Sequence, residues 1–90
     1  MELVVVSVLG ADRVGIVAGI AGVLAKHNAN IVDIAQTVVR DIFSMVMLVD
    51  ISKADVDIAG LRAELEEIGR KLGVMVAVHH IDVFRYMQRI

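Results

Sequence analysis

The sequence contains no cysteine, no proline and no tryptophan, and its aromatic residues are two phenylalanines and one tyrosine. Without cysteine the chain can form neither a disulfide framework nor a thiolate metal site, and a cytoplasmic location is the default expectation. The formal net charge is −2, with both signs interspersed. This balance predicts no nucleic-acid binding through a basic surface, and so few aromatic rings offer no platform on which bases could stack.

Long hydrophobic runs are also missing. A membrane-spanning helix needs about 20 consecutive apolar residues. Polar residues and glycine interrupt the apolar stretches here, at Ser7, Gly10, Asp12, Arg13, Asp33, Gln36 and Thr37. The chain has no basic segment ahead of its first hydrophobic stretch. Neither a membrane span nor a secretory signal is therefore predicted.

Apolar residues are nevertheless in excess. They make up 58% of the 90 residues, against roughly 45–50% in typical soluble domains. A chain of this length corresponds to one domain, residues 1–90, and one small domain has only a modest core. The surplus predicts that a ligand or a second subunit covers part of the surface, and we expect a homodimer or a higher homo-oligomer.

Hydrophobic periodicity divides the chain into strands and helices. Runs rich in β-branched residues predict strands over 2–9, 31–40, 43–51 and 74–81. Spacings of three and four residues predict helices from near Val14 to Lys26 or His27 and from Ile58 to Leu72, with a short terminal helix over 82–89. The expected caps are Asp12 for the first helix, and Ser52 or Asp55 and then Gly73 for the second.

The resulting order, β-α-β-β-α-β, predicts an α+β, ferredoxin-like sandwich. Right-handed crossovers and short connections favour a four-stranded antiparallel sheet of order 4-1-3-2 with both helices on one face. The other face would be uncovered, although three of the strands are apolar on both sides. An exposed apolar face of this size is typical of an association site.

The first helix has an unusual outer side. Opposite its apolar stripe lie small residues, with Lys26 as the single charge: Gly15, Ala18, Gly19, Gly22 and Ala25. Glycine inside a helix costs roughly 0.5–1 kcal/mol relative to alanine. Its repeated use predicts that the second helix or another subunit packs closely on this side.

Two segments resemble the signature of ACT domains. Leu9–Val17 (LGADRVGIV) is similar to the family's loop, with its D/N-R/K-x-G-I/V core, and His27–Ile31 (HNANI) supplies the Asn-Ile pair that opens the second strand. The likeness is closer to short, single-domain ACT proteins of the UPF0237 type, which are related to glycine-cleavage regulators. The pieces that carry it are Gly15–Gly19, Asn30–Ile34, Gln36-Thr37 and Ile81–Met87.

The resemblance implies a regulatory, non-catalytic module that needs no cofactor and binds a small ligand, in most cases an amino acid. The family holds this ligand at a dimer interface, between the loop after the first strand and the start of the second strand of a neighbour. A regulated enzyme or regulator would be a further partner. Carried onto this chain, the ligand-binding residues are Gly10, Ala11, Asp12, Arg13, Val14, Gly15, Asn30 and Asp33.

The chemistry of these residues suits an amino acid. Gly15 lets the backbone approach a ligand without a Cβ in the way, and the free N–H groups of the first helical turn suit a carboxylate. Arg13 could add positive charge. Asn30 can both donate and accept, and Asp33 could accept from an ammonium group. Serine-binding ACT domains carry histidine in place of Gly10 and asparagine in place of Asp12, so the sequence argues against serine.

Other interpretations stay open. His79 and His80 would face opposite sides of a strand, and His80 with Asp82 gives too few ligands for a closed metal site, so no metal is predicted. No catalytic constellation stands out, although the same fold carries acylphosphatase chemistry for which Arg13 would be the candidate. A purely structural interaction module without a small ligand is the remaining alternative.

Overall fold

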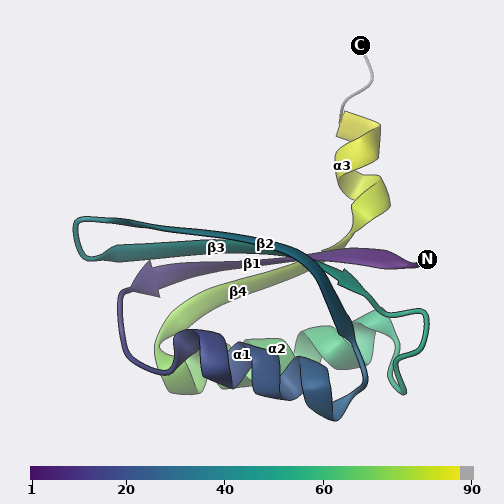
Figure 1. The fold of residues 1–90 in the computed structure, drawn as a ribbon, viewed down its shortest axis with the longest axis horizontal. Coiled ribbons are helices and arrows are strands. Elements are labelled where there is room, and N and C mark those ends of the chain that lie inside the picture. Colours follow the sequence, from purple (N-terminus) through teal and green to yellow (C-terminus); the bar gives the residue numbers. More distant parts are fainter. Residues whose placement is uncertain (88–90) are drawn as a thin grey trace.

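The computed structural model describes residues 1–87. Its elements are β1 (Leu3–Ala11), α1 (Ile16–Lys26), β2 (Asn30–Val39), β3 (Ile42–Asp50), α2 (Ile58–Leu72), β4 (Val74–His80) and α3 (Ile81–Met87). The sheet has the order β2-β3-β1-β4 with every pair antiparallel. Helices α1 and α2 cover one face, and α3 rises from the other side (Figure 1). The predicted fold class and strand order are confirmed.

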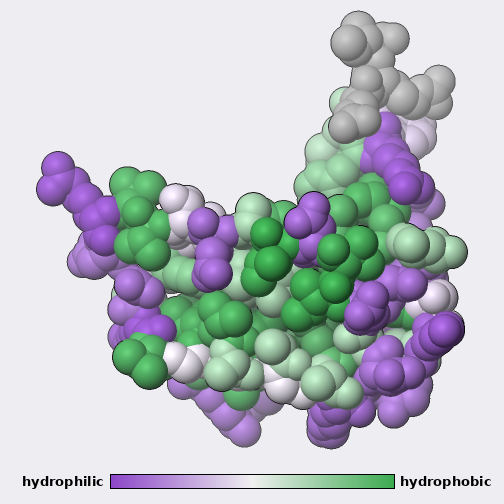
Figure 2. All heavy atoms as spheres, in the orientation of Figure 1, coloured by the Kyte–Doolittle hydropathy of each residue, from purple (hydrophilic) through white to green (hydrophobic). Residues whose placement is uncertain are grey.

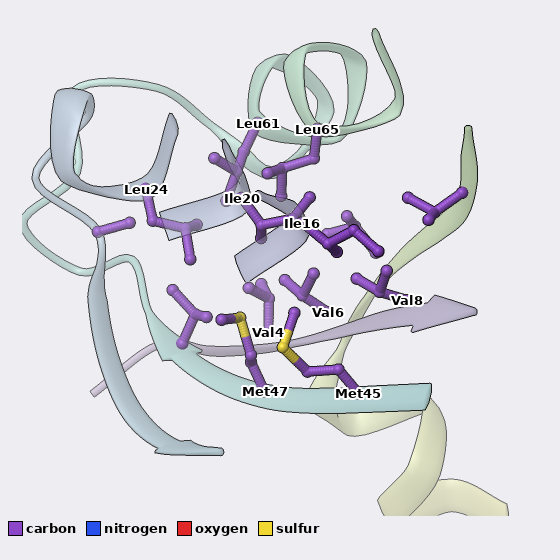
Figure 3. Close-up of a cluster of buried hydrophobic side chains, with 14 of the residues drawn as sticks. Val4, Val6, Val8, Ile16, Ile20, Leu24, Met45, Met47, Leu61 and Leu65 are labelled. Carbon is purple, nitrogen blue, oxygen red and sulfur yellow. The ribbon is translucent and has the colours of Figure 1, made fainter. Parts of the chain in front are cut away.

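The core lies between the sheet and the two long helices. Every second residue of β1 and β3 points toward the helices, because side chains alternate along a strand. These side chains interlock with the apolar stripes of both helices (Figure 3). The fully buried members include Val4, Val6, Val8, Ile16, Ile20, Leu24, Met45, Met47, Leu61 and Leu65.

The start of α1 differs from the prediction. The helix begins at Ile16, and its N-cap is Gly15 with φ of 94° and no capping side chain. Asp12 is therefore not the cap. Its backbone N–H instead donates to the carbonyl of Asp41 at 2.9 Å, which ties this loop to the β2–β3 turn.

Helix α2 begins at Ile58, as predicted, but its cap was placed too early. The capping side chain is Asp57, whose carboxylate accepts from the Gly60 N–H at 2.8 Å, and neither Ser52 nor Asp55 has this role. The far end agrees with the prediction, because Gly73 closes α2 in the left-handed region with φ of 75°. The terminal helix runs to Met87, and its predicted continuation to residue 89 lies outside the described residues.

The small residues of α1 are only partly used within one chain. A Cβ on Gly19 would lie 2.9 Å from Cδ1 of Leu72, so α2 packs closely there as predicted. At Gly22 a Cβ would meet no atom within 4 Å. The outer side of α1 around Gly22 is therefore bare in a single copy of the chain.

The end of α1 is held by a cluster of polar contacts around the buried His27. His27 is 9% exposed, and its Nδ1 lies 2.6 Å from Oδ1 of Asp55, while its Nε2 contacts the carboxylate of Glu64. Glu64 also pairs with Lys26 at 3.0 Å. These contacts join α1 to α2 and to the loop that precedes it.

No helix within residues 1–87 has the length and apolarity that a bilayer crossing requires.

Candidate functional site

The predicted loop begins later than the sequence analysis placed it. Gly10 and Ala11 are the last residues of β1 and pair with Phe43 and Ile42 of β3. A Cβ on Gly10 would lie 2.8 Å from Cγ1 of Val74 and 3.1 Å from its Cα, so β4 approaches too closely for any larger residue. Gly10 is therefore a packing glycine, and a side chain at this position would collide with Val74 on the helix-covered side of the sheet.

The loop residues 12–15 are exposed and lead into an uncapped helix. The first hydrogen bond within α1 runs from the Gly19 N–H to the Gly15 carbonyl at 2.9 Å. The N–H groups of residues 16–18 therefore lack a helical acceptor. No acidic side chain stands in this first turn, and a Cβ on Gly15 would meet open space. Val14 beside it is fully exposed. An anionic group could approach these N–H groups without obstruction.

Arg13 is directed away from the start of α1. Its Nη1 would lie 3.2 Å from a Cβ on Gly73, so the guanidinium rests against the carboxyl end of α2. A cation is favoured there by the helix dipole. In this position the side chain belongs to the α2–β4 turn, and its charge is not aimed at the first turn of α1.

Asn30 and Asp33 lie far from this loop in the same chain. Asn30 pairs with Asp50 of β3, at the end of the sheet where β1 begins, whereas Ala11 pairs with Ile42 at the opposite end. Asp33 follows a β-bulge after Ile31 and faces the side of the sheet that α1 and α2 leave uncovered. One copy of the chain therefore does not bring the predicted ligand-binding residues together.

The end of the sheet that holds Asn30 also carries fixed negative charge. The backbone N–H of Ser52 donates to Asp50 at 3.0 Å, and this bond is the main reason that the pKa of Asp50 is lowered. The Ser52 hydroxyl and the Glu2 N–H add to the effect. The Asp33 carboxylate accepts from the Ile34 N–H at 2.9 Å. A positively charged ligand group is favoured near these carboxylates.

Between the two ends lies an exposed apolar surface, which we call the α1–β2 side. By their register opposite Met47 and Phe43, the β2 residues Ile34 and Val38 point toward the helix layer, yet both are exposed because no helix lies over them. On α1, Val17 faces β2, away from Gly19 and its contact with α2. The α1–β2 side consists of Val17, Ile34 and Val38, with the exposed small residue Ala18 beside Val17.

Figure 2 shows hydrophobic and weakly hydrophobic residues over most of the side where β2 and α1 face the viewer, with hydrophilic residues at the β2–β3 turn and along the lower rim. The exposure of Ile34 and Val38 was not predicted from the sequence. One residue hints at it: the polar Gln36 lies on the same side of the strand as these two. Alternation alone places all three toward the core, and only the tertiary arrangement shows that the helix layer stops short of β2.

The fold and the uncapped loop-to-helix junction define a class of protein. A family model described as ACT domain matches residues 2–79, so the chain belongs to the ACT domain family. ACT domains are generally regulatory ligand-binding modules, and no catalytic domain is indicated in the matched residues. More narrowly, the chain is a UPF0237 protein: it is 82% identical over 90 residues to a UPF0237 protein of Pyrobaculum aerophilum, covering all of both chains.

Solved structures agree with this assignment. An ACT domain protein from Streptococcus pneumoniae is 34% identical, with a TM-score of 0.80, and the match covers 99% of this chain and 97% of that one. A structure assigned as a glycine cleavage system transcriptional repressor has a TM-score of 0.75 at 18% identity, covering 88% of this chain and 45% of that one. The second likeness shows a shared fold.

Proposed function

We propose that this protein is a regulatory, non-catalytic module that binds an amino acid between two copies of the chain. The observation that carries the proposal is the start of α1. Its first-turn N–H groups have no capping side chain, its N-cap glycine leaves open space, and no acidic residue stands in the first turn itself. This arrangement suits the carboxylate of a free amino acid.

The second half of the site comes from a neighbouring copy. Asn30 and the loop lie at opposite ends of the sheet, but β2 is an edge strand along its whole length. If two β2 strands pair in antiparallel fashion near their midpoints, Asn30 of one copy reaches the end of the sheet where the other copy has its loop. The same pairing covers the α1–β2 side of both copies, because exposed apolar surfaces and free strand edges both favour association.

This arrangement assigns different groups of the ligand to different residues. The carboxylate faces the first-turn N–H groups and Gly15 of one copy. The amide of Asn30 from the other copy donates or accepts at the ligand, and the negative charge of Asp50 beside it favours the ammonium group. Asp33 faces the opposite side of the sheet from α1 and is not assigned to the ligand. Gly10 and Arg13 serve the packing of β1 and α2 rather than the ligand. The departures at Gly10 and Asp12 continue to argue against serine.

A thermal-shift screen over the free amino acids tests the proposal. A ligand at 100 times its Kd adds about 2.7 kcal/mol to the stability of the native state. For a domain of this size that corresponds to a rise in Tm on the order of 10 °C. We expect one amino acid, or a small chemically related group, to produce such a rise.

The matched variants are Asn30→Ala and Asn28→Gly. The first removes the amide assigned to the ligand and should abolish the thermal shift. The second removes an amide two residues away, and glycine keeps the left-handed turn that Asn28 adopts with φ of 57°, so the shift should persist. An unchanged shift in Asn30→Ala would move the site elsewhere. If no amino acid raises Tm, the exposed apolar surfaces favour the alternative, an interaction module without a small ligand.

A further inference from the structure

The sheet has a second exposed apolar surface, which we call the open face: the side of the sheet opposite α1 and α2. One row of short side chains crosses all four strands here, because Ala35 pairs with Val46, Val46 with Ser7, and Ser7 with Ala77. Larger residues flank this row, Leu9 and Met75 on one side at β1 and β4, and Leu48 on the other side at β3. The open face is therefore a trough between two ridges.

The trough is hollowed, and the charged residue in its lining is Asp33 at the β2 edge. Shallow hollows lie along it, one lined by Asp33, Ala35, Val46 and Leu48 and another by Ser7, Leu9, Met75 and Ala77. Neither the row of short residues nor the ridge of Leu9 and Met75 contains an ionisable side chain. Apolar side chains are nevertheless exposed to solvent here: Met75 is 72% exposed and Val46 is 46% exposed. Away from Asp33 at its edge, a charged partner would gain no ion pair here, so most of the surface is matched to another apolar face.

Helix α3 adds a wall to this trough. The Phe84 ring meets the His79 ring edge-on, with centroids 5.9 Å apart, and Val5 beneath is only 9% exposed although it points to the open face. From this anchor α3 stands away from the sheet, so the two form an angle (Figure 1). Other apolar side chains of α3 remain exposed, Val83 and Met87 among them.

The size of this surface is sufficient for stable pairing with a second copy of the chain. Four strands about 4.8 Å apart and about seven residues long give a sheet footprint of roughly 450 Å². The inner half of a seven-residue helix adds on the order of 150 Å². Two such surfaces placed face to face bury about 1,200 Å² in total, the lower end of the range for stable protein interfaces. The sheet alone would fall short, and α3 makes up the difference.

We infer that the open face and α3 form a second self-association surface, on which another copy of this chain packs with its own open face. A two-fold axis uses the same patch twice, and a trough flanked by ridges can receive a ridge of an identical surface. This interface is separate from the α1–β2 side, so the two together assemble a tetramer from two ligand-binding pairs. The inference goes beyond the proposed amino-acid site and does not need it.

Substitutions that separate the two surfaces test this inference. Light scattering on the intact chain should give about four times its mass of 9.8 kDa. Val46→Lys in the trough should halve the measured mass and preserve the thermal shift with the amino acid. Ile34→Lys on the α1–β2 side should also halve the mass and abolish that shift. Met75→Lys repeats the first test at a more exposed position, where folding is less at risk.

The absence of native cysteine allows a direct proximity test. Val46→Cys would place two thiols across sheets that pack about 10 Å apart, within reach of a bismaleimide. A covalent dimer should form at dilutions where Ala63→Cys, on the exposed side of α2, stays uncrosslinked. Unchanged mass in both Val46→Lys and Met75→Lys, or equal crosslinking of the two cysteine variants, would overturn the inference. The proposed amino-acid site would be unaffected by that result, because its own readouts are the ligand shift and Asn30→Ala.

Discussion

Helices α1 and α2 cover the same face of the sheet, but their outward sides differ. Helix α2 has a charged outer surface and is closed at both ends by Asp57 and Gly73. On that surface, Arg70 donates to Glu67 at 2.6 Å and lowers the pKa of its carboxyl. Helix α1 has no side-chain cap, and Lys26 is its single charged residue. Helix α2 is capped and has a polar outer surface suited to water. Helix α1 has an uncapped first turn and an outer side with almost no polar side chains.

This difference separates what stabilises the fold from what the protein does with its surface. A helix surface that faces only solvent can keep its capping side chains and its charges, and α2 has both. The start of α1 lacks a cap where a ligand is proposed, and its flank lacks charge where a second copy is proposed. We therefore expect substitutions on the inner sides of the two helices to have similar effects, and substitutions at their ends and outer sides to have different ones.

The largest effects should come from the inner sides. Ile20 and Leu61 are both fully buried in the same core, one from each helix. Ile20→Ala and Leu61→Ala should each reduce the free energy of unfolding by about 3 kcal/mol, because each leaves a cavity in a packed interior. Urea unfolding at equal protein concentration measures this. A much smaller loss for Ile20→Ala would show that α1 is also loosely held on its inner side.

A smaller effect is expected at the helix starts, where the two helices should differ. Asp57→Ala removes the hydrogen bond to the Gly60 N–H and should cost about 1 kcal/mol. Asp12→Ala is the matched change ahead of α1. Since the Asp12 side chain caps nothing, we expect almost no loss in the same urea experiment. A cost at Asp12 equal to that at Asp57 would mean that α1 is capped after all, and would remove the main support for the ligand site.

The cap assignments show where sequence reasoning stops. Both helices and the C-cap at Gly73 follow from local patterns, because period, propensity and turn residues act over a few neighbours. The strand order then follows from the handedness of the crossovers. Asp12 and Asp55 were wrong because several polar residues precede each helix, and only the path of the chain decides which one reaches the first turn. The exposure of the α1–β2 side was not predicted for a related reason. Alternation assigns Ile34 to the core, and the sequence of β2 does not reveal how far the helix layer extends over the sheet.

The smallest effect, and the one most specific to the comparison, concerns Gly22. In a single copy a Cβ at this position meets no atom within 4 Å, so Gly22→Ala should stabilise α1 by about 0.5–1 kcal/mol through backbone entropy alone. We expect that gain in the Ile34→Lys background, where the α1–β2 side is free. In the otherwise unchanged chain a second copy that extends from the α1–β2 side onto the outer side of α1 would be pushed away by the added methyl group, so the gain should shrink or reverse. Urea unfolding of the four proteins gives the coupling between the two sites. Equal gains in both backgrounds would mean that no partner approaches Gly22, and that the bare outer side of α1 is a solvent surface.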